Sequence, residues 1–296
     1  MFKLASNFYL LSMRIYSVLI IVFFVCTQTF SQHKRAYSIF TGEGEEIHYT
    51  DMINQVEMSD IILFGEQHNS AIAHWLQFEL TSDLIKVRNV KLGAEMFERD
   101  NQEALNSYLK GEIDQKGLDT IARLWSNHKT DYAPLLDLAK SNQLEFVATN
   151  IPRRYANMVY KNSFSVLDTL SSEEKKWIAP LPIEFVPDLP TYQNILKMMG
   201  DHGTPELVMA QAIKDATMAF SILENKNEQE LFIHFNGAYH SDYFEGILWY
   251  LKLTEPELNY KTISTVTQKD ISHLDEEHIN KADFIIVVNE NVTTTY

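Results

Sequence analysis

Residues 61–80 read IILFGEQHNSAIAHWLQFEL, and this stretch decides the fold. Its first four residues are all apolar, which is typical of a strand covered on both faces, as in a parallel sheet between two layers of helices. Gly65 ends the strand, Glu66 and His68 follow it, and an apolar helical pattern comes next. Ligands of open α/β sheets bind outside the carboxyl ends of the strands. The stretch therefore predicts an α/β fold with a functional site directly after this strand.

Further segments extend the predicted sheet. Strands are expected at 60–64, 90–94, 145–149, 231–235, 261–266 and 283–288, with a short edge strand near 37–40. Helical patterns separate several of them, so we expect a mostly parallel sheet with right-handed crossovers, flanked by helices. A long helix should begin after Thr204, a suitable N-cap residue, with Pro205 at its first position. Helical insertions are expected at about 99–141 and 155–201, and prolines in the second favour a lid over the carboxyl-end edge of the sheet.

The first 31 residues have the pattern of a secretory signal peptide. Arg14 precedes the run IYSVLIIVFFVC, which is too short to span a bilayer comfortably, and Met13 is an alternative start. We therefore expect an exported, periplasmic protein whose residues 32–296 form a single domain, with an uncleaved anchor as the alternative. Cys26 is the only cysteine, so the mature chain has no disulfide and no thiol ligand. Lipidation of Cys26 would instead attach the domain to a membrane.

The chain is acidic, with 25 basic and 40 acidic residues and a net charge of −15. Such a charge repels phosphate groups, which argues against nucleic acid and anionic membrane surfaces as partners. The residues after the first strand lack the glycines of a phosphate loop, and no Gly-x-Ser-x-Gly elbow is present. Nucleotide binding and serine hydrolysis are therefore poor interpretations.

Polar residues with useful chemistry follow the predicted strands. Glu66, His68, Glu95 and His240 supply carboxylates and imidazoles suited to general acid–base catalysis or, for His68, Glu95 and His240, to a divalent metal. Their spacing matches no local metal motif. The alternative is a polar pocket in which these groups are satisfied by hydrogen bonds.

Two further pairs are candidate ligand-binding residues. Arg153 and Arg154 follow the third strand and suit a carboxylate or phosphate, or a salt bridge to one of the site carboxylates. Gln211 and Asp215 are four residues apart and share one face of the helix after Pro205.

Short motifs occur in consistent order between Tyr37 and Val288. They are 65–69 (GEQHN), 92–97 (LGAEMF), 131–135 (DYAPL), 150–153 (NIPR), 210–211 (AQ) with 215–219 (DATMA), and 236–240 (NGAYH). Together they resemble the ChaN-like haem-binding uptake proteins, part of a wider group with the erythromycin esterases, TraB and Tiki proteins. The resemblance implies an α/β fold, export, and haem binding in iron acquisition through a tyrosine at a homodimer interface. Esterase and Tiki relatives use the residues matching Glu66, His68, Glu95 and His240 for hydrolysis, in Tiki with a metal.

The leading expectation is therefore an exported protein that binds haem, with Tyr108 and Tyr132 as the candidate iron ligands. The alternative is a metal-dependent hydrolase in which His68, Glu95 and His240 hold a metal or activate water. A third possibility, a non-catalytic partner-binding module, depends on the proline-interrupted helical segment alone.

Overall fold

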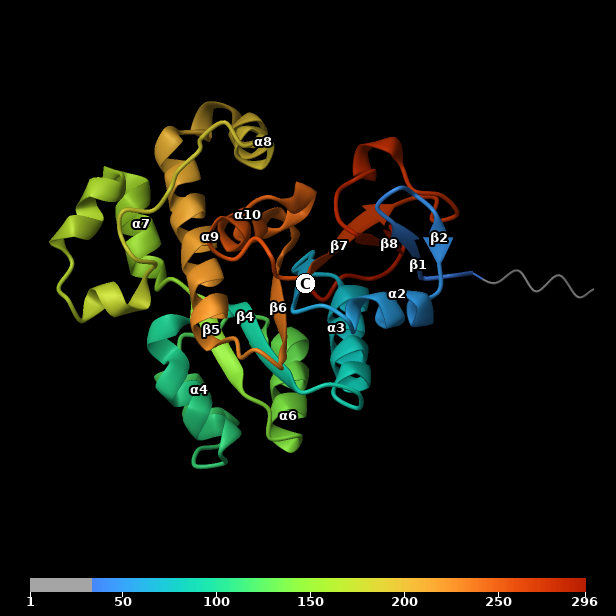
Figure 1. Ribbon diagram of the computed structural model, residues 1–296, viewed down its shortest axis with the longest axis horizontal. Helices are drawn as coiled ribbons and strands as arrows, with labels where there is room; N and C mark the ends of the chain where they lie inside the picture. The colour runs from blue at the N-terminus through green and yellow to red at the C-terminus, as the bar shows by residue number, and fades with distance from the viewer. Residues whose placement is uncertain (1–33) are drawn as a thin grey trace, which may run out of the picture. The chain divides into compact units, whose positions relative to one another are not determined.

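The computed structural model describes residues 34–296, whose strands form one sheet (Figure 1). The strands are β1 (Tyr37–Thr41), β2 (Glu46–Ile47), β3 (Ile61–Glu66), β4 (Val90–Glu98), β5 (Phe146–Asn150), β6 (Leu231–Gly237), β7 (Tyr260–Gln268) and β8 (Phe284–Asn289). Their order is β2-β1-β8-β7-β3-β6-β4-β5. The six strands from β8 to β5 are parallel, while β1 is antiparallel to both of its neighbours. The predicted mostly parallel α/β sheet is confirmed.

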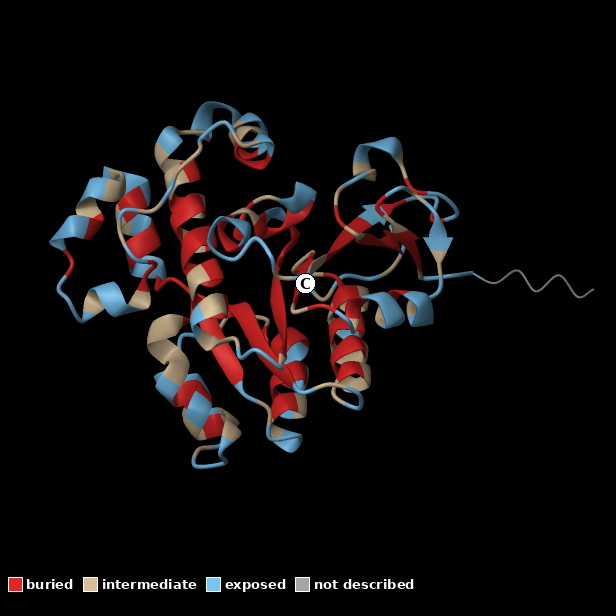
Figure 2. Ribbon diagram, in the orientation of Figure 1, coloured by how far each residue is buried: buried red, intermediate tan, exposed pale blue. Residues whose placement is uncertain are grey.

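Helices cover both faces of this sheet. They are α2 (Tyr49–Val56), α3 (Ala71–Leu84), α4 (Gln102–Leu109), α5 (Gln115–Ile121), α6 (Ala133–Ser141), α7 (Arg153–Asn162), α8 (Pro190–Met199), α9 (Pro205–Asn225) and α10 (Ile247–Thr254). Ile62 and Phe64 of β3 pack on the face covered by α2, α3, α4 and α6. Ile61 and Leu63 pack on the opposite face with α9 and α10. Alternate strand residues point to opposite faces, so a strand between two helical layers can be buried at every position, as β3 is. Figure 2 shows that the central strands of the sheet are mostly buried.

The start of α9 follows from its sequence. The Thr204 side chain accepts the backbone N–H of Leu207 at 3.3 Å, and Pro205 is the first helical residue. The helix continues to Asn225 and lies across the sheet, where it separates α7 and α8 from the strands (Figure 1). Helices α7 and α8 therefore pack on α9.

The two expected insertions differ in their packing. Region 99–141 is the connection between β4 and β5, and its helices α4 and α6 contribute to the core on one face of the sheet. Region 155–201 instead packs on α9, through α7 and through α8. The signal peptide predicted at 1–31, with Met13 and Cys26, lies outside the described residues. Within those residues, no helix has the length and apolar character needed to cross a membrane.

Candidate functional site

A cleft of about 1200 Å³ opens at the carboxyl ends of the parallel strands. Among the residues that line it are Glu66 at the end of β3, His68 in the next turn, Glu95 in β4 and His240 after β6. Parallel strands bring their carboxyl ends to one edge of the sheet, which explains why residues far apart in sequence meet there. All four residues singled out from the sequence thus share one cavity.

His240 is buried between two carboxylates. Its Nδ1 lies 2.5 Å from Asp215 Oδ1 on α9, and its Nε2 lies 3.3 Å from Glu95 Oε1. The other Glu95 oxygen accepts the backbone N–H of Gly237 at 2.8 Å. Tyr192 on α8 donates its hydroxyl to Asp215 Oδ2 at 2.8 Å. Both ring nitrogens of His240 are therefore occupied within the protein.

The electrostatics of this cluster follow from its geometry. Burial by itself lowers the pKa of His240, but the facing carboxylates of Glu95 and Asp215 raise it to about 10. Burial by itself raises the pKa of Glu95, but His240, together with His68 and the N–H of Gly237, lowers it well below its usual range. Burial dominates for Asp215 and raises its pKa despite the neighbouring His240. At neutral pH the cluster therefore holds an imidazolium opposite the Glu95 carboxylate.

His68 faces the cleft and is anchored from behind by Glu66. Its Nδ1 lies 2.9 Å from Glu66 Oε1, which also accepts the Tyr132 hydroxyl at 2.8 Å. Gln77 donates to the second Glu66 oxygen at 2.6 Å. The His68 side chain is 36% exposed. A Cβ added at Gly237 would lie only 2.8 Å from His68 Nε2, so the glycine leaves room for the ring.

The Glu66 contact sets the chemistry of His68. Burial lowers the pKa of His68, but the hydrogen bond to Glu66 and the charges of Glu95 and Glu66 raise it above its ordinary value overall. When the ring is neutral, a proton on Nδ1 satisfies Glu66 and leaves the Nε2 lone pair directed away from it. His68 can therefore accept a proton or bind a metal centre from the cleft.

A second layer of polar residues lies behind His68, and its contacts were not predicted from the sequence, where His74 was expected to be a core or capping residue one turn from the pocket. His74 Nε2 lies 3.0 Å from the backbone oxygen of His68 and 3.6 Å from Asp131 Oδ2. The same Asp131 oxygen accepts hydrogen bonds from Asn127 at 2.7 Å and from Thr295 at 2.9 Å. The motif at 131–135 and His74 were the sequence signals for this layer. The tail near Thr295 gave no signal, because it reaches Asp131 across 164 residues.

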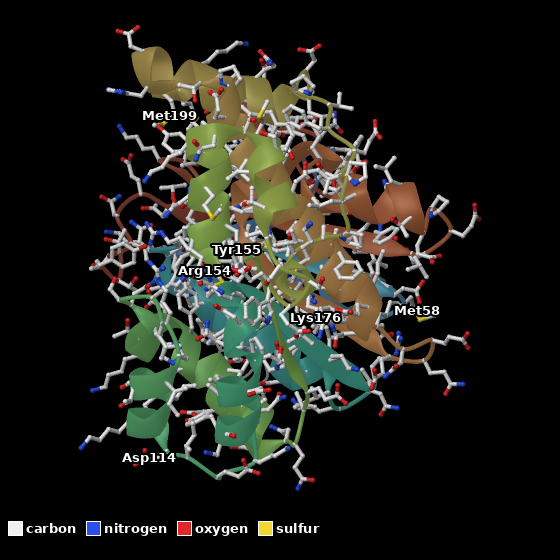
Figure 3. The ribbon with its side chains drawn as sticks, turned by 90° about the vertical axis from the view of Figure 1, so that its left-hand side faces the viewer. Met58, Asp114, Arg154, Tyr155, Lys176 and Met199 are labelled. Carbon is white, nitrogen blue, oxygen red and sulfur yellow. The ribbon has the colours of Figure 1, made fainter. Side chains whose placement is uncertain are left out.

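The two adjacent arginines have different surroundings. Arg153 is exposed and lines the cleft. Arg154 pairs with Asp100, and its guanidinium lies 4.4 Å from the ring centre of Tyr155 and 5.2 Å from that of Trp177. Figure 3 shows Arg154 and Tyr155 next to each other. Neither arginine forms a salt bridge to Glu66 or Glu95, which was the alternative expected from the sequence. Arg154 pairs with Asp100 instead.

The predicted pair on α9 is divided between the cleft and the buried cluster. Gln211 lines the cleft, and its side-chain oxygen accepts a hydrogen bond from Lys214 at 2.8 Å. Asp215, one turn further along α9, is buried against His240. Asp215 is therefore a support for His240 and does not line the cleft.

Neither candidate tyrosine lines the cleft. Tyr108 donates its hydroxyl to Asp137, and the Lys140 ammonium lies 3.9 Å from its ring centre. Burial and the charge of Glu66 raise the pKa of Tyr132 far above its ordinary value, which keeps it a neutral phenol. The tyrosines that do line the cleft are Tyr239 and Tyr296, which are 47% and 67% exposed.

The predicted metal site is not supported. Within residues 34–296, no group of three or more His, Cys, Asp or Glu side chains is arranged to hold a metal ion. Both nitrogens of His240 and both oxygens of Glu95 are already used within the buried cluster. Of the three residues expected to bind a metal, only His68 has a ring nitrogen left for a molecule bound in the cleft.

A comparison with protein families identifies the chain. The sequence profile of the family described as haem-binding uptake, Tiki superfamily, ChaN matches residues 52–251. The chain belongs to this ChaN family. The matched range of this ChaN-family protein includes Glu66, His68, Glu95 and His240. A search of curated proteins found no match.

Several solved structures are similar to this ChaN-family protein. One is ChaN of Campylobacter jejuni, described as binding haem cofacially, with a TM-score of 0.65, 17% identity, and coverage of 86% of this chain and 98% of that one. A Bacillus cereus protein has a TM-score of 0.49 and 12% identity, covering 81% of this chain and 90% of its own. A mutant of the erythromycin esterase EreC in its open conformation has a TM-score of 0.45 and 11% identity, covering 85% and 83%. At 17% identity, the likeness to the Campylobacter jejuni protein shows a common fold.

Proposed function

We propose that this ChaN-family protein is exported and binds haem in the cleft as part of haem or iron uptake. The observation that carries the proposal is the cleft itself, whose volume of about 1200 Å³ exceeds the roughly 300–1,000 Å³ typical of ligand pockets. It lies at the edge of the sheet where α/β proteins bind ligands. Family membership supports haem as the ligand.

The side chains of the cleft suit a flat aromatic ligand with a central metal ion. Met198, Met199 and Tyr239 line it and are 63%, 44% and 47% exposed, which gives apolar surface for the ring. Histidine and tyrosine both ligate haem iron in proteins. His68, held by Glu66 on one nitrogen, and Tyr239, with its exposed phenol, are therefore the side chains we propose as iron ligands.

The test is a spectroscopic titration of the purified protein with haem. Wild-type protein should give a saturable shift of the Soret band. If His68 ligates the iron, His68→Ala should change the position of that band or weaken haem binding at least tenfold. If Tyr239 ligates it, Tyr239→Phe should do so. The controls His273→Ala and Tyr160→Phe change exposed residues that do not line the cleft. A wild-type spectrum equal to that of haem with an unrelated protein would refute haem binding. Wild-type spectra from both cleft variants would refute this choice of ligands.

Export and assembly are part of the same proposal. The N-terminal sequence supports a cleaved leader and a periplasmic protein, or a membrane-attached protein if Cys26 carries a lipid. Sequencing the N-terminus of the mature protein tests this, and an intact leader would contradict it. We also propose a homodimer around haem, on the ground of the family resemblance. Light scattering with and without haem should then show a doubled mass in the loaded protein.

A second candidate function is hydrolysis at the same site, favoured by the placement of His68. Glu66 orients the ring, and Nε2 is left to take a proton from water as a general base. The charged pair of Glu95 and His240 lies close by. Activity toward model esters that His68→Ala removes and His273→Ala retains would support this function. Equal activity in both variants would contradict it.

A further inference from the structure

The segment 290–296, which follows β8, runs to the turn that carries His68. The backbone N–H of Glu290 donates to the backbone oxygen of Gln268 in β7 at 2.9 Å. Val292 packs against the apolar core on the face of the sheet that α3 covers. The segment reaches the cleft at Tyr296, and Figure 1 marks the end of the chain beside α3. It therefore approaches the site although it belongs to no helix or strand.

Thr295 contacts the His68 turn through two hydrogen bonds. Its backbone N–H donates to the backbone oxygen of Asn69, the residue after His68, at 3.0 Å. Its hydroxyl donates to Asp131 Oδ2 at 2.9 Å. This one residue therefore connects the turn to the polar layer behind it.

Asp131 depends on the donors at a single oxygen. The residue is buried, and its Oδ1 has no hydrogen-bond partner within residues 34–296. Its Oδ2 accepts hydrogen bonds from the Asn127 amide at 2.7 Å and from the Thr295 hydroxyl. A buried carboxylate that loses a donor is costly to keep charged, because no water replaces the lost contact. Loss of the Thr295 hydroxyl should therefore disturb the position of Asp131.

The same network holds the backbone of His68. His74 Nε2 lies 3.0 Å from the backbone oxygen of His68 and 3.6 Å from Asp131 Oδ2. The Asn127 amide lies 3.5 Å from that backbone oxygen. Thr295 holds the next backbone oxygen along, that of Asn69. Two successive carbonyl groups of the turn are thus fixed, and the backbone sets the point from which the His68 ring extends.

We propose that Thr295 is a positioning residue for His68, which holds the turn so that the ring stays against Glu66 with Nε2 toward the cleft. Glu66 Oε1 lies 2.9 Å from His68 Nδ1, and Glu66 itself is buried at the end of β3. A turn that moves relative to the sheet would therefore lengthen this contact. The inference rests on the proposed function for what His68 does in the cleft, whereas the contacts that hold His68 involve no ligand.

The test is an NMR comparison of ligand-free protein, prepared as wild type, Thr295→Val, Thr295→Ser and Thr293→Val. Valine keeps the shape of threonine without the hydroxyl, while serine keeps the hydroxyl. Thr293→Val is the matched control, since it makes the same change at an exposed position that does not line the cleft. All variants should fold, because both positions lie outside the helices and strands. The ring signals of His68 are assigned by their absence in His68→Ala.

Thr295→Val should shift the ring signals of His68 and speed amide hydrogen exchange in the turn 67–70 about twofold to tenfold, as the loss of one hydrogen bond implies. Thr295→Ser and Thr293→Val should keep the wild-type signals and exchange rates. Wild-type signals in Thr295→Val, or the same shift in Thr295→Ser, would overturn the positioning role. Exchange that accelerates equally in β6 would show a general loss of stability and would also overturn it. Haem is absent from this comparison, so a protein that fails to bind haem would refute the proposed function and leave this result unaffected.

Discussion

Replacing Glu95 with glutamine tests whether the buried cluster is charged as its geometry indicates. The pKa of His240 rises from 6.5 to about 10 in the folded protein. A rise of this size corresponds to about 5 kcal/mol in favour of the imidazolium. Two carboxylates share that effect, so the loss of one should lower the free energy of unfolding by about 2 to 3 kcal/mol. The melting temperature should fall by about 4 to 12 °C.

The pH dependence gives the sharper signature. The folded-state pKa of His240 lies above its unfolded value, so its contribution is complete below pH 6.5 and is lost as the pH rises through about 10. In Glu95→Gln the pKa of His240 falls, so less of this contribution exists at any pH. The difference in stability between wild type and variant should therefore be largest near pH 6 and shrink toward pH 10.

The assay is urea unfolding followed by circular dichroism at pH 6, 8 and 10. Glutamine keeps a side-chain oxygen for the N–H of Gly237, so the change removes charge with little change in shape. Glu103→Gln, at an exposed position on α4, is the control and should change stability by less than about 0.5 kcal/mol. A loss in Glu95→Gln that is equal at pH 6 and pH 10 would refute the charged cluster.

Three further predictions concern His68 and its support. Tyr132→Phe removes the hydroxyl that donates to Glu66 and should lower the free energy of unfolding by about 1 to 3 kcal/mol in urea, whereas an unchanged midpoint would contradict this role. Gly237→Ala puts a Cβ 2.7 Å from His68 Cε1, so unfolding by heat should occur earlier and the ring resonances of His68 should shift; unchanged resonances would argue against the close approach. The pKa of His68, measured by NMR, should exceed 6.5, since the hydrogen bond to Glu66 and nearby carboxylates outweigh burial, and Glu66→Gln should lower it. A pKa that stays the same in that variant would show that Glu66 is not the cause.

The strands could be predicted from the sequence because they are buried on both faces. β3 is apolar from Ile61 to Phe64, and β6 is apolar from Leu231 to Phe235 except at His234, which is typical of strands covered on both faces. The end of β4 was harder to predict. It continues from Ala94 to Glu98, and its pairing with β5 shifts between these two residues. A shift in register depends on the neighbouring strand, so the strand was expected to end at Ala94, before Glu95.

The sequence predicted which residues lie together at the site, but it did not predict the side chains that contact them. Glu66 and His240 follow strands that end at one edge of the sheet, and this rule requires no knowledge of packing. Their partners come from helices. Asp215 reaches His240 across 25 residues, and Tyr132 reaches Glu66 across 66 residues. These contacts depend on how α9 and α6 pack on the sheet, which residue spacing does not specify.

The most direct test of the account is a crystal structure of the haem-loaded protein, with the iron located by its anomalous signal. The account predicts iron within the cleft, bound by His68 or Tyr239. Iron at any other place on the chain, with the cleft free of tetrapyrrole density, would contradict it.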